Sequence, residues 1–233
     1  MTSPFLVRLG SLIAIGLCLA GCGRSENYRY KLTLAVNTPD GVKKASSVVE
    51  VAFFDVSIPA RGTMRKLNGE ALYLYLGNAT RPLVALLTGP LHPRSDKDPL
   101  WPGRDSGPDL NRIYGPGLPN LLDDVARIAR ARGAHSITPD DLPQLVTFAD
   151  VNDPATVIEV DPNDLGATLG MGISWNEITL ESTDEPITTG IRNRLPWLGE
   201  YREKRLSLDG AELTTKRRTA NVLKAWDFDQ SKR

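Results

Sequence analysis

The clearest pattern in the chain is an alternation of apolar and polar positions between residues 27 and 37. Its apolar members are Tyr28, Tyr30, Leu32, Leu34 and Val36. A period of two with aromatic and branched side chains predicts a half-buried strand. The turn-forming sequence Thr38-Pro39-Asp40-Gly41 follows it. A second apolar run, from Ser46 to Phe54, then predicts a returning antiparallel strand.

Shorter apolar runs predict more strands. Gly69–Gly77 and Pro82–Thr88 flank a turn and are apolar on both faces, which is typical of central strands. Three more runs alternate with polar turns further along, at Leu145–Phe148, Thr156–Val160 and Ile173–Leu180. Near the end of the chain, the pattern predicts a hairpin at Leu206-Ser207-Leu208 that turns at Asp209-Gly210, and a helix over Ala220–Trp226.

One amphipathic helix is predicted over Leu118–Arg132. Acidic residues near its start and arginines near its end match the helix dipole, and Gly133 is a candidate stop. The candidate start Asp161-Pro162-Asn163-Asp164 predicts a second helix, with Asp161 as cap and Pro162 in the first turn. The apolar stripe of the first helix consists of Leu118, Leu121, Leu122, Val125, Ile128 and Ala129.

The segment Gly89–Pro119 has no period. It holds seven prolines and five glycines, together with Trp101 and Tyr114. Irregular loops of this length are uncommon in compact domains and are commonly functional or disordered, and the aromatic residues argue against disorder. With the strands and the helix, this predicts an α+β fold, mostly antiparallel sheet, in which residues 27–233 form a single domain.

Charge is balanced overall but unevenly distributed. Residues 136–191 hold eleven acidic residues and no lysine or arginine, whereas the chain on either side is net basic. The acids therefore either pair with the basic flanks or bind cations. An EF-hand is rejected at Asp161-Pro162-Asn163-Asp164-Leu165-Gly166, because Leu165 and Gly172 occupy ligand positions. A less regular calcium site built from several acidic turns stays open.

Few residues suit catalysis. His92 and His135 are the two histidines, and Cys18 and Cys22 are the two cysteines, so metal sites built on several of either are excluded. Gly166, Gly170 and Gly172 are spaced wrongly for a dinucleotide site, and phosphate-loop and nucleophile-elbow motifs are absent. The basic tail around Lys216-Arg217-Arg218 lacks interleaved aromatics. We therefore expect no catalytic residue, cofactor, metal or nucleic acid, and an enzyme is the less favoured reading.

The first residues have the pattern of a secretory leader. Arg8 precedes an apolar core, Leu9–Leu19, which is shorter than the roughly 18 apolar residues that span a bilayer. The core ends at Leu19-Ala20-Gly21-Cys22, which resembles the lipobox of bacterial lipoproteins. In that family, the cysteine thiol receives a diacylglyceryl group, a peptidase cuts before the cysteine, and the new amine is acylated. An ordinary secretory leader cut near Gly21 is the alternative.

This resemblance implies a cell-envelope protein. Residues 1–21 would be the signal peptide, Cys22 the lipidation site, and residues 22–26 a short tether to the membrane. Gly23 replaces the aspartate that usually retains such proteins in the inner membrane, so the periplasmic face of the outer membrane is expected. Such a protein would have a non-enzymatic binding or structural role with an unknown envelope protein or ligand. The alternative is a periplasmic hydrolase with its site under the 89–119 loop.

A second resemblance covers most of the mature chain. Three segments are similar to sequences in uncharacterised proteobacterial proteins: Ile178 to Ile191, the following Arg194-Leu195-Pro196-Trp197-Leu198, and the opening Tyr28-Arg29-Tyr30. That family implies no known activity, so it adds no site residue.

Overall fold

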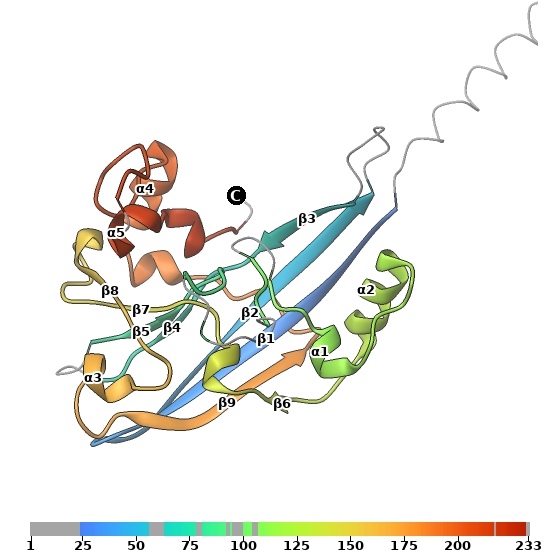
Figure 1. Ribbon diagram of the computed structural model, residues 1–233, viewed down its shortest axis with the longest axis horizontal. Coiled ribbons are helices and arrows are strands. Elements are labelled where there is room, and N and C mark those ends of the chain that lie inside the picture. Colours follow the sequence, from blue (N-terminus) through green and yellow to red (C-terminus); the bar gives the residue numbers. More distant parts are fainter. Residues whose placement is uncertain are drawn as a thin grey trace, which may run out of the picture.

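The computed structural model describes residues 24–55, 63–77, 81–91, 94, 100–103, 107–216 and 218–231 (Figure 1). The leader, the lipobox and Cys22 lie outside the described residues. So do His92, Arg217, and parts of the 78–81 turn and the 89–119 loop.

The larger sheet is built on the predicted hairpin. β1 (Ser25–Thr38) and β2 (Gly41–Asp55) pair antiparallel along their whole length, from Ser25 opposite Phe54 to Thr38 opposite Gly41. The predicted alternation is confirmed, since the apolar residues of β1 from Tyr28 to Val36 are buried. β3 (Thr63–Asn68), β9 (Ser174–Ser182) and β6 (His135–Ser136) complete an antiparallel sheet in the order β3-β2-β1-β9-β6.

The smaller sheet has the order β4-β5-β7-β8 and is also antiparallel. Its strands are β4 (Leu72–Leu74), β5 (Leu83–Ala85), β7 (Leu145–Phe148) and β8 (Val157–Glu159). Burial confirms the expectation that β5 is apolar on both faces, whereas Tyr73 in the middle of β4 is only partly buried. Of these two strands, only β5 is central in the hydrogen-bonded order, because β4 lies at the edge of the sheet.

Side chains on the two faces of the smaller sheet pack into two different apolar cores. Leu83 and Ala85 of β5 join a core shared with β1, β2 and the main helix, whereas Val84 points into a second core. The second core lies under the C-terminal segments, where the rings of Phe148, Trp197 and Phe228 meet at centroid distances of 5.5–6.1 Å. The smaller sheet therefore links the large sheet to the C-terminal helices, which gather at one end of the molecule (Figure 1).

The predicted amphipathic helix is α2 (Leu121–Arg130). The side chain of Asn120 accepts hydrogen bonds from the N–H groups of Leu122 and Asp123, which sets its start. Leu122, Val125 and Ile128 are buried as predicted. Leu118 and Leu121 are nearly half exposed, so their place in the apolar stripe was wrong. The helix also ends before Gly133, at Arg130, with Ala131 as the C-cap.

The remaining helices are short: α1 (Asn111–Tyr114) within the 89–119 segment, α3 (Leu165–Leu169), α4 (Leu198–Lys204) and α5 (Thr219–Val222). The cap of α3 is Asp164, which accepts from the Ala167 N–H, and not Asp161 as predicted. In the described part of the chain, no helix is both long and apolar enough to cross a membrane.

The predicted C-terminal hairpin was wrong. Around Asp209-Gly210 the chain makes a tight turn in which the Gly210 N–H donates to the Ser207 carbonyl. Ser207 forms one isolated bridge with Lys224, and no ladder follows. The predicted helix over Ala220–Trp226 is divided into α5 and a 3-10 turn at Ala225–Asp227.

Candidate functional site

A cavity of about 220 Å3 lies under the 89–119 segment, where the hydrolase alternative places its site. It is lined from that segment by Leu100, Arg112 and Ile113, and from the opposite side by His135–Thr138 and Asp141. Ser, His and Asp side chains thus come together here, as the hydrolase interpretation requires.

Their contacts do not form a catalytic triad. One carboxylate oxygen of Asp141 pairs with Arg112 at 3.1 Å, and the other accepts from the Thr138 hydroxyl at 2.8 Å. The His135 ring meets the Tyr114 ring edge-on at 5.0 Å. Within the described residues, no hydrogen bond joins His135 to Ser136 or Asp141. The carboxylate is therefore not oriented to activate the histidine.

A second cavity, of about 410 Å3, lies beside the acidic turn after β8. Arg94, Glu159 and Asp161 contribute its charged groups. The Arg94 guanidinium donates to the carbonyls of Leu142 and Pro143, and burial lowers its pKa. Asp161 accepts from the Asn163 N–H, so its carboxylate stabilises the turn. Throughout the described residues, no three His, Cys, Asp or Glu side chains group closely enough to hold a metal ion, so nothing there supports the calcium alternative.

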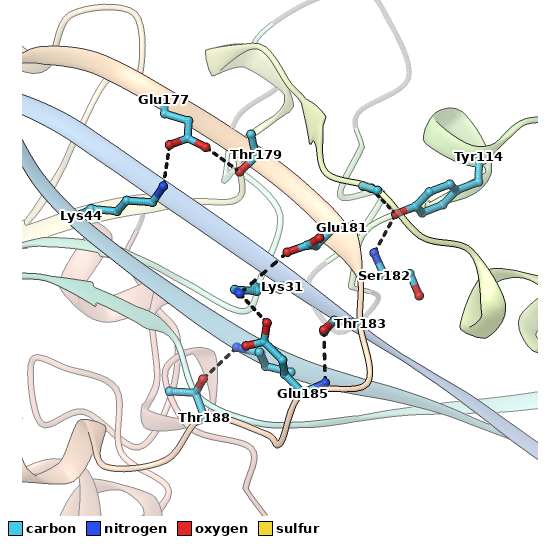
Figure 2. Close-up of polar contacts among 12 residues, drawn as sticks. Lys31, Lys44, Tyr114, Glu177, Thr179, Glu181, Ser182, Thr183, Glu185 and Thr188 are labelled. Carbon is cyan, nitrogen blue, oxygen red and sulfur yellow. Dashed lines mark hydrogen bonds and ion pairs between the residues drawn. The ribbon is translucent and has the colours of Figure 1, made fainter.

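The acidic stretch meets the basic N-terminal strands on the outer face of the large sheet (Figure 2). The Lys31 ammonium lies 2.5 Å from Glu185 and 3.8 Å from Glu181, and Lys44 lies 2.7 Å from Glu177. These pairs support the first of the two charge interpretations, pairing with the basic flanks.

The same contacts hold a crossing segment, residues 183–190, over the sheet. The Arg29 guanidinium donates to the carbonyls of Asp184 and Glu185. Thr188 then exchanges two hydrogen bonds with the backbone of Val48, through its own N–H and its hydroxyl. The chain continues to Ile191, whose N–H donates to the buried Glu70 carboxylate at 2.7 Å and whose side chain enters the second core. Burial raises the pKa of Glu70, against the effect of the Ile191 N–H.

The largest of these cavities, of about 460 Å3, is a groove at the free edge of β3, which we call the β3 groove. It is formed by residues 65–67 of β3, by Arg202 of α4, and by Trp226, Asp229 and Gln230 of the C-terminal segment. β3 is the terminal strand of the large sheet, so one of its edges pairs with β2 and the other faces the groove.

An ion-pair triad closes one wall of the β3 groove. The buried Asp229 carboxylate lies 2.6 Å from Arg192 and 3.1 Å from Arg202, and it also accepts from the N–H and hydroxyl of Ser231. Burial alone would raise the pKa of Asp229, but the Ser231 hydrogen bonds and the two guanidinium groups outweigh it and lower that pKa. The acid is thus charged at neutral pH, and Arg192 and Arg202 neutralise it within the protein.

The remaining charges of the β3 groove are positive. Arg65 lies over the Phe53 ring at 5.9 Å, and no carboxylate among the described residues pairs with Arg65 or Lys66. Trp226 is 38% exposed, with the Lys224 ammonium 5.2 Å from its ring. Cationic groups beside an exposed indole suit an anionic ligand that also carries apolar surface.

Sequence reasoning missed the β3 groove. Its residues come from three segments, of which the first, in β3, lies more than 130 positions before the other two. The β3 sequence Thr63–Asn68 also has no clear period. Of the residues that the sequence singled out, His135 lies in the small cavity, and Cys22 and His92 lie outside the described residues.

A scan against protein-family models and searches of curated proteins and of solved structures found no match to this chain.

Proposed function

We propose that this protein is a lipid-anchored envelope protein, attached through Cys22 to the periplasmic face of the outer membrane, with a binding role. The observation that carries the proposal is Leu19-Ala20-Gly21-Cys22 at the end of a short apolar leader. Three acyl chains at about 0.8 kcal/mol per buried CH2 hold a protein firmly, whereas one chain binds only marginally.

The start of β1 shortens the tether. The sequence placed the tether at residues 22–26, but Ser25 and Glu26 already belong to β1. Three steps separate Cys22 from Ser25, which span at most about 11 Å when extended. The domain would therefore lie directly against the bilayer at the end of the sheet where β1 begins.

The surface at that end suits contact with lipid. Phe54 lies opposite Ser25 and Met64 lies opposite Phe54, and both apolar side chains are exposed, by 39% and 51%. Arg24 pairs with Asp123 at 2.7 Å, which places the exposed Leu121 of α2 at the same end. Tyr28 is unsuited to lipid contact, because it is buried and its hydroxyl donates to the Pro108 carbonyl.

Two experiments test the proposal. Cells fed labelled palmitate should label the protein, and Cys22→Ala should abolish both the label and membrane fractionation. Photo-crosslinking side chains at Phe54 and Met64 should then capture lipid. The matched control is Val42, which is 54% exposed but lies at the other end of β2, about 40 Å away at about 3.3 Å per residue. Label retained by the Cys22 variant would refute lipidation at Cys22. Equal capture of lipid at Val42 would refute contact between the bilayer and the Phe54–Met64 end of the sheet.

The alternative is a periplasmic hydrolase acting at the cavity under the 89–119 segment. The engagement of Asp141 by Arg112 and Thr138 favours binding over catalysis there. A serine-reactive fluorophosphonate probe that labels Ser136 in the purified protein, and no longer labels it in His135→Ala, would decide for the hydrolase.

A further inference from the structure

The β3 groove combines a free sheet edge, an excess of positive charge and an exposed indole. We infer that it binds an extended acidic segment of a partner protein, which adds to β3 as a further strand. This site is separate from the lipid anchor and does not depend on it.

The backbone of β3 is oriented for such an addition. The N–H and C=O of a strand residue point to the same edge, and successive residues alternate between the two edges. The backbone of Val48 hydrogen-bonds Thr188 on the side of β2 where β3 lies. Ala52 is four residues further along β2, so its backbone groups also point to β3, and those of its partner Lys66 point back to β2. Arg65 and Leu67 therefore direct their N–H and C=O groups into the groove.

The C-terminal segment already uses this edge one step further on. The Gly69 carbonyl accepts from the Gln230 N–H at 2.9 Å, and Glu70 forms a bridge with Asp229. Within the described ranges, no backbone group pairs with the edge at Arg65 or Leu67. A strand in the β3 groove would extend the line that Asp229 and Gln230 begin, which is the usual mode of strand addition.

Charge selects the side chains of the added strand. Arg65, Lys66 and Arg202 line the groove, and its one acid, Asp229, is neutralised by Arg192 and Arg202. Basic segments are repelled, whereas Glu or Asp side chains on the added strand would reach the cations. The ring of Trp226 offers an apolar surface to the side chains between them, and the groove volume lies within the range of about 300–1,000 Å3 typical of ligand sites.

Two other occupants share part of this chemistry. An anionic phospholipid headgroup would use the same cations but has no use for the backbone edge. A second copy of this chain could present its own acidic stretch, and the complex would then be a dimer. The experiment below separates all three.

The probe is a capped six-residue peptide of alternating Glu and Val, titrated against the full-length protein in neutral detergent. We expect saturable binding that weakens as salt is added, because the charges are partly exposed. Two control peptides are alternating Lys and Val, and the Glu–Val peptide N-methylated at every residue, which blocks both of its edges. Both should fail to bind, the first by charge and the second because it cannot pair with the edge.

Amide hydrogen exchange locates the peptide. The N–H groups of Arg65 and Leu67 should become protected on binding. Those of Met64 and Lys66, which already face β2, should not change. Protection without this alternation, or no protection at Leu67, would overturn the inference.

Variants test the charges. Lys66→Glu should weaken peptide binding by about fivefold, which is the upper effect of one partly exposed ion pair. Lys43→Glu makes the same charge change at the other end of β2 and should leave binding unaltered. Equal effects of the two variants overturn the site.

The competing occupants have their own signatures. Equal affinity for the N-methylated peptide, with phosphatidylglycerol vesicles binding in a manner sensitive to Lys66→Glu, would identify a lipid site and overturn the peptide inference. Concentration-dependent dimers that both the Glu–Val peptide and Lys66→Glu dissociate would overturn it in favour of a second copy of this chain. Because Cys22→Ala should leave peptide binding intact, failure here is distinguishable from failure of the lipid anchor.

Discussion

Exchanging the acid and the amide at positions 111 and 124 tests how the irregular 107–119 segment is held against α2. The Asp124 carboxylate accepts from the Leu118 N–H, from the Arg127 Nε and from the Asn111 amide, the last at 2.8 Å. The Asn111 oxygen in turn accepts from Arg127 at 2.6 Å. Burial alone would raise the pKa of Asp124, but these donors outweigh it and lower that pKa.

Asp124→Asn leaves no orientation that satisfies every donor. If its oxygen stays on Leu118 and Arg127, its amide NH2 faces the Asn111 NH2. If Asn111 flips instead, its NH2 faces the Arg127 guanidinium. A hydrogen bond to a charged group contributes about 1.5–3 kcal/mol, so we expect a loss of about 2 kcal/mol. For a chain of this size, that lowers Tm by about 4–8 °C.

The double variant should recover stability. Asn111→Asp alone places two carboxylates 2.8 Å apart and should cost a similar amount. Together, Asp124→Asn and Asn111→Asp restore a donor opposite each acceptor and place the new acid beside Arg127. We therefore expect the double variant to lie within about 0.5 kcal/mol of the wild type, a coupling energy above the upper end usually seen for neighbours.

Urea unfolding followed by far-ultraviolet circular dichroism measures all four proteins at pH 7. The slope with urea must be unchanged for the comparison to hold. If the losses of the two single variants simply add in the double variant, Asn111 and Asp124 are not coupled and the reasoning is refuted.

Three further predictions concern the fold. Asn120→Ala should cost about 1 kcal/mol by removing the N-cap of α2, while Asn120→Ser should retain most of that stability in the same urea assay. The folded-state pKa of Asp229 lies below its ordinary value of 3.8, so its contribution to the free energy of unfolding is present above that pH and is lost as pH falls through the lower folded value. Asp229→Asn should therefore flatten the acid limb of a curve of stability against pH, and an unchanged limb would contradict this. Thr188→Val should cost about 1–3 kcal/mol by leaving the Val48 N–H without its acceptor, and a loss no larger than that of an exposed Thr→Val change would show that the crossing segment is not anchored there.

Local patterning was sufficient for part of the fold. The period-two run of β1 and the Pro-Asp-Gly turn specify the hairpin, because each side chain's environment follows from its position on the pleat. The stripe of α2 likewise predicted a helix with Leu122, Val125 and Ile128 buried. The α+β class with antiparallel sheets follows from these elements.

The missed elements depend on partners. β3 has no apolar period, and it is a strand because β2 extends far enough to pair with it from Glu50 to Asp55. α4 is short and carries one buried residue, Leu198, so its amphipathic signal is weak. The β3 groove arises only where these elements and the C-terminal segment meet, and no spacing within one segment encodes that.

The acidic stretch illustrates how an ambiguous charge pattern is resolved by topology. β9 pairs with β1, so its outward acids stand beside the outward lysines of the hairpin, with Glu181 directly opposite Lys31. Cross-strand opposite charges of this kind contribute about 0.2–1 kcal/mol each. The sequence offered both pairing and cation binding, and strand order decides in favour of pairing at these positions.

The two proposals together restrict where a partner could be. β3 lies two strands from β1, which is about 10 Å at about 4.8 Å per strand. Arg65 pairs with Phe53, next to the Phe54 that lies opposite Ser25, so the β3 groove opens near the same end of the sheet as the tether. With a tether of at most about 11 Å, a strand bound in the groove would lie within roughly 25 Å of the lipid surface. With the anchor at Cys22 that we propose, the groove would lie near the membrane. A partner that reaches it must therefore present its acidic segment close to the bilayer, as the periplasmic part of another membrane-bound protein does.

Lengthening the chain after Gly23 with a Gly/Ser linker should then leave peptide affinity in solution unchanged while weakening capture of such a partner in cells. An equal loss of both would show that the linker damages the fold.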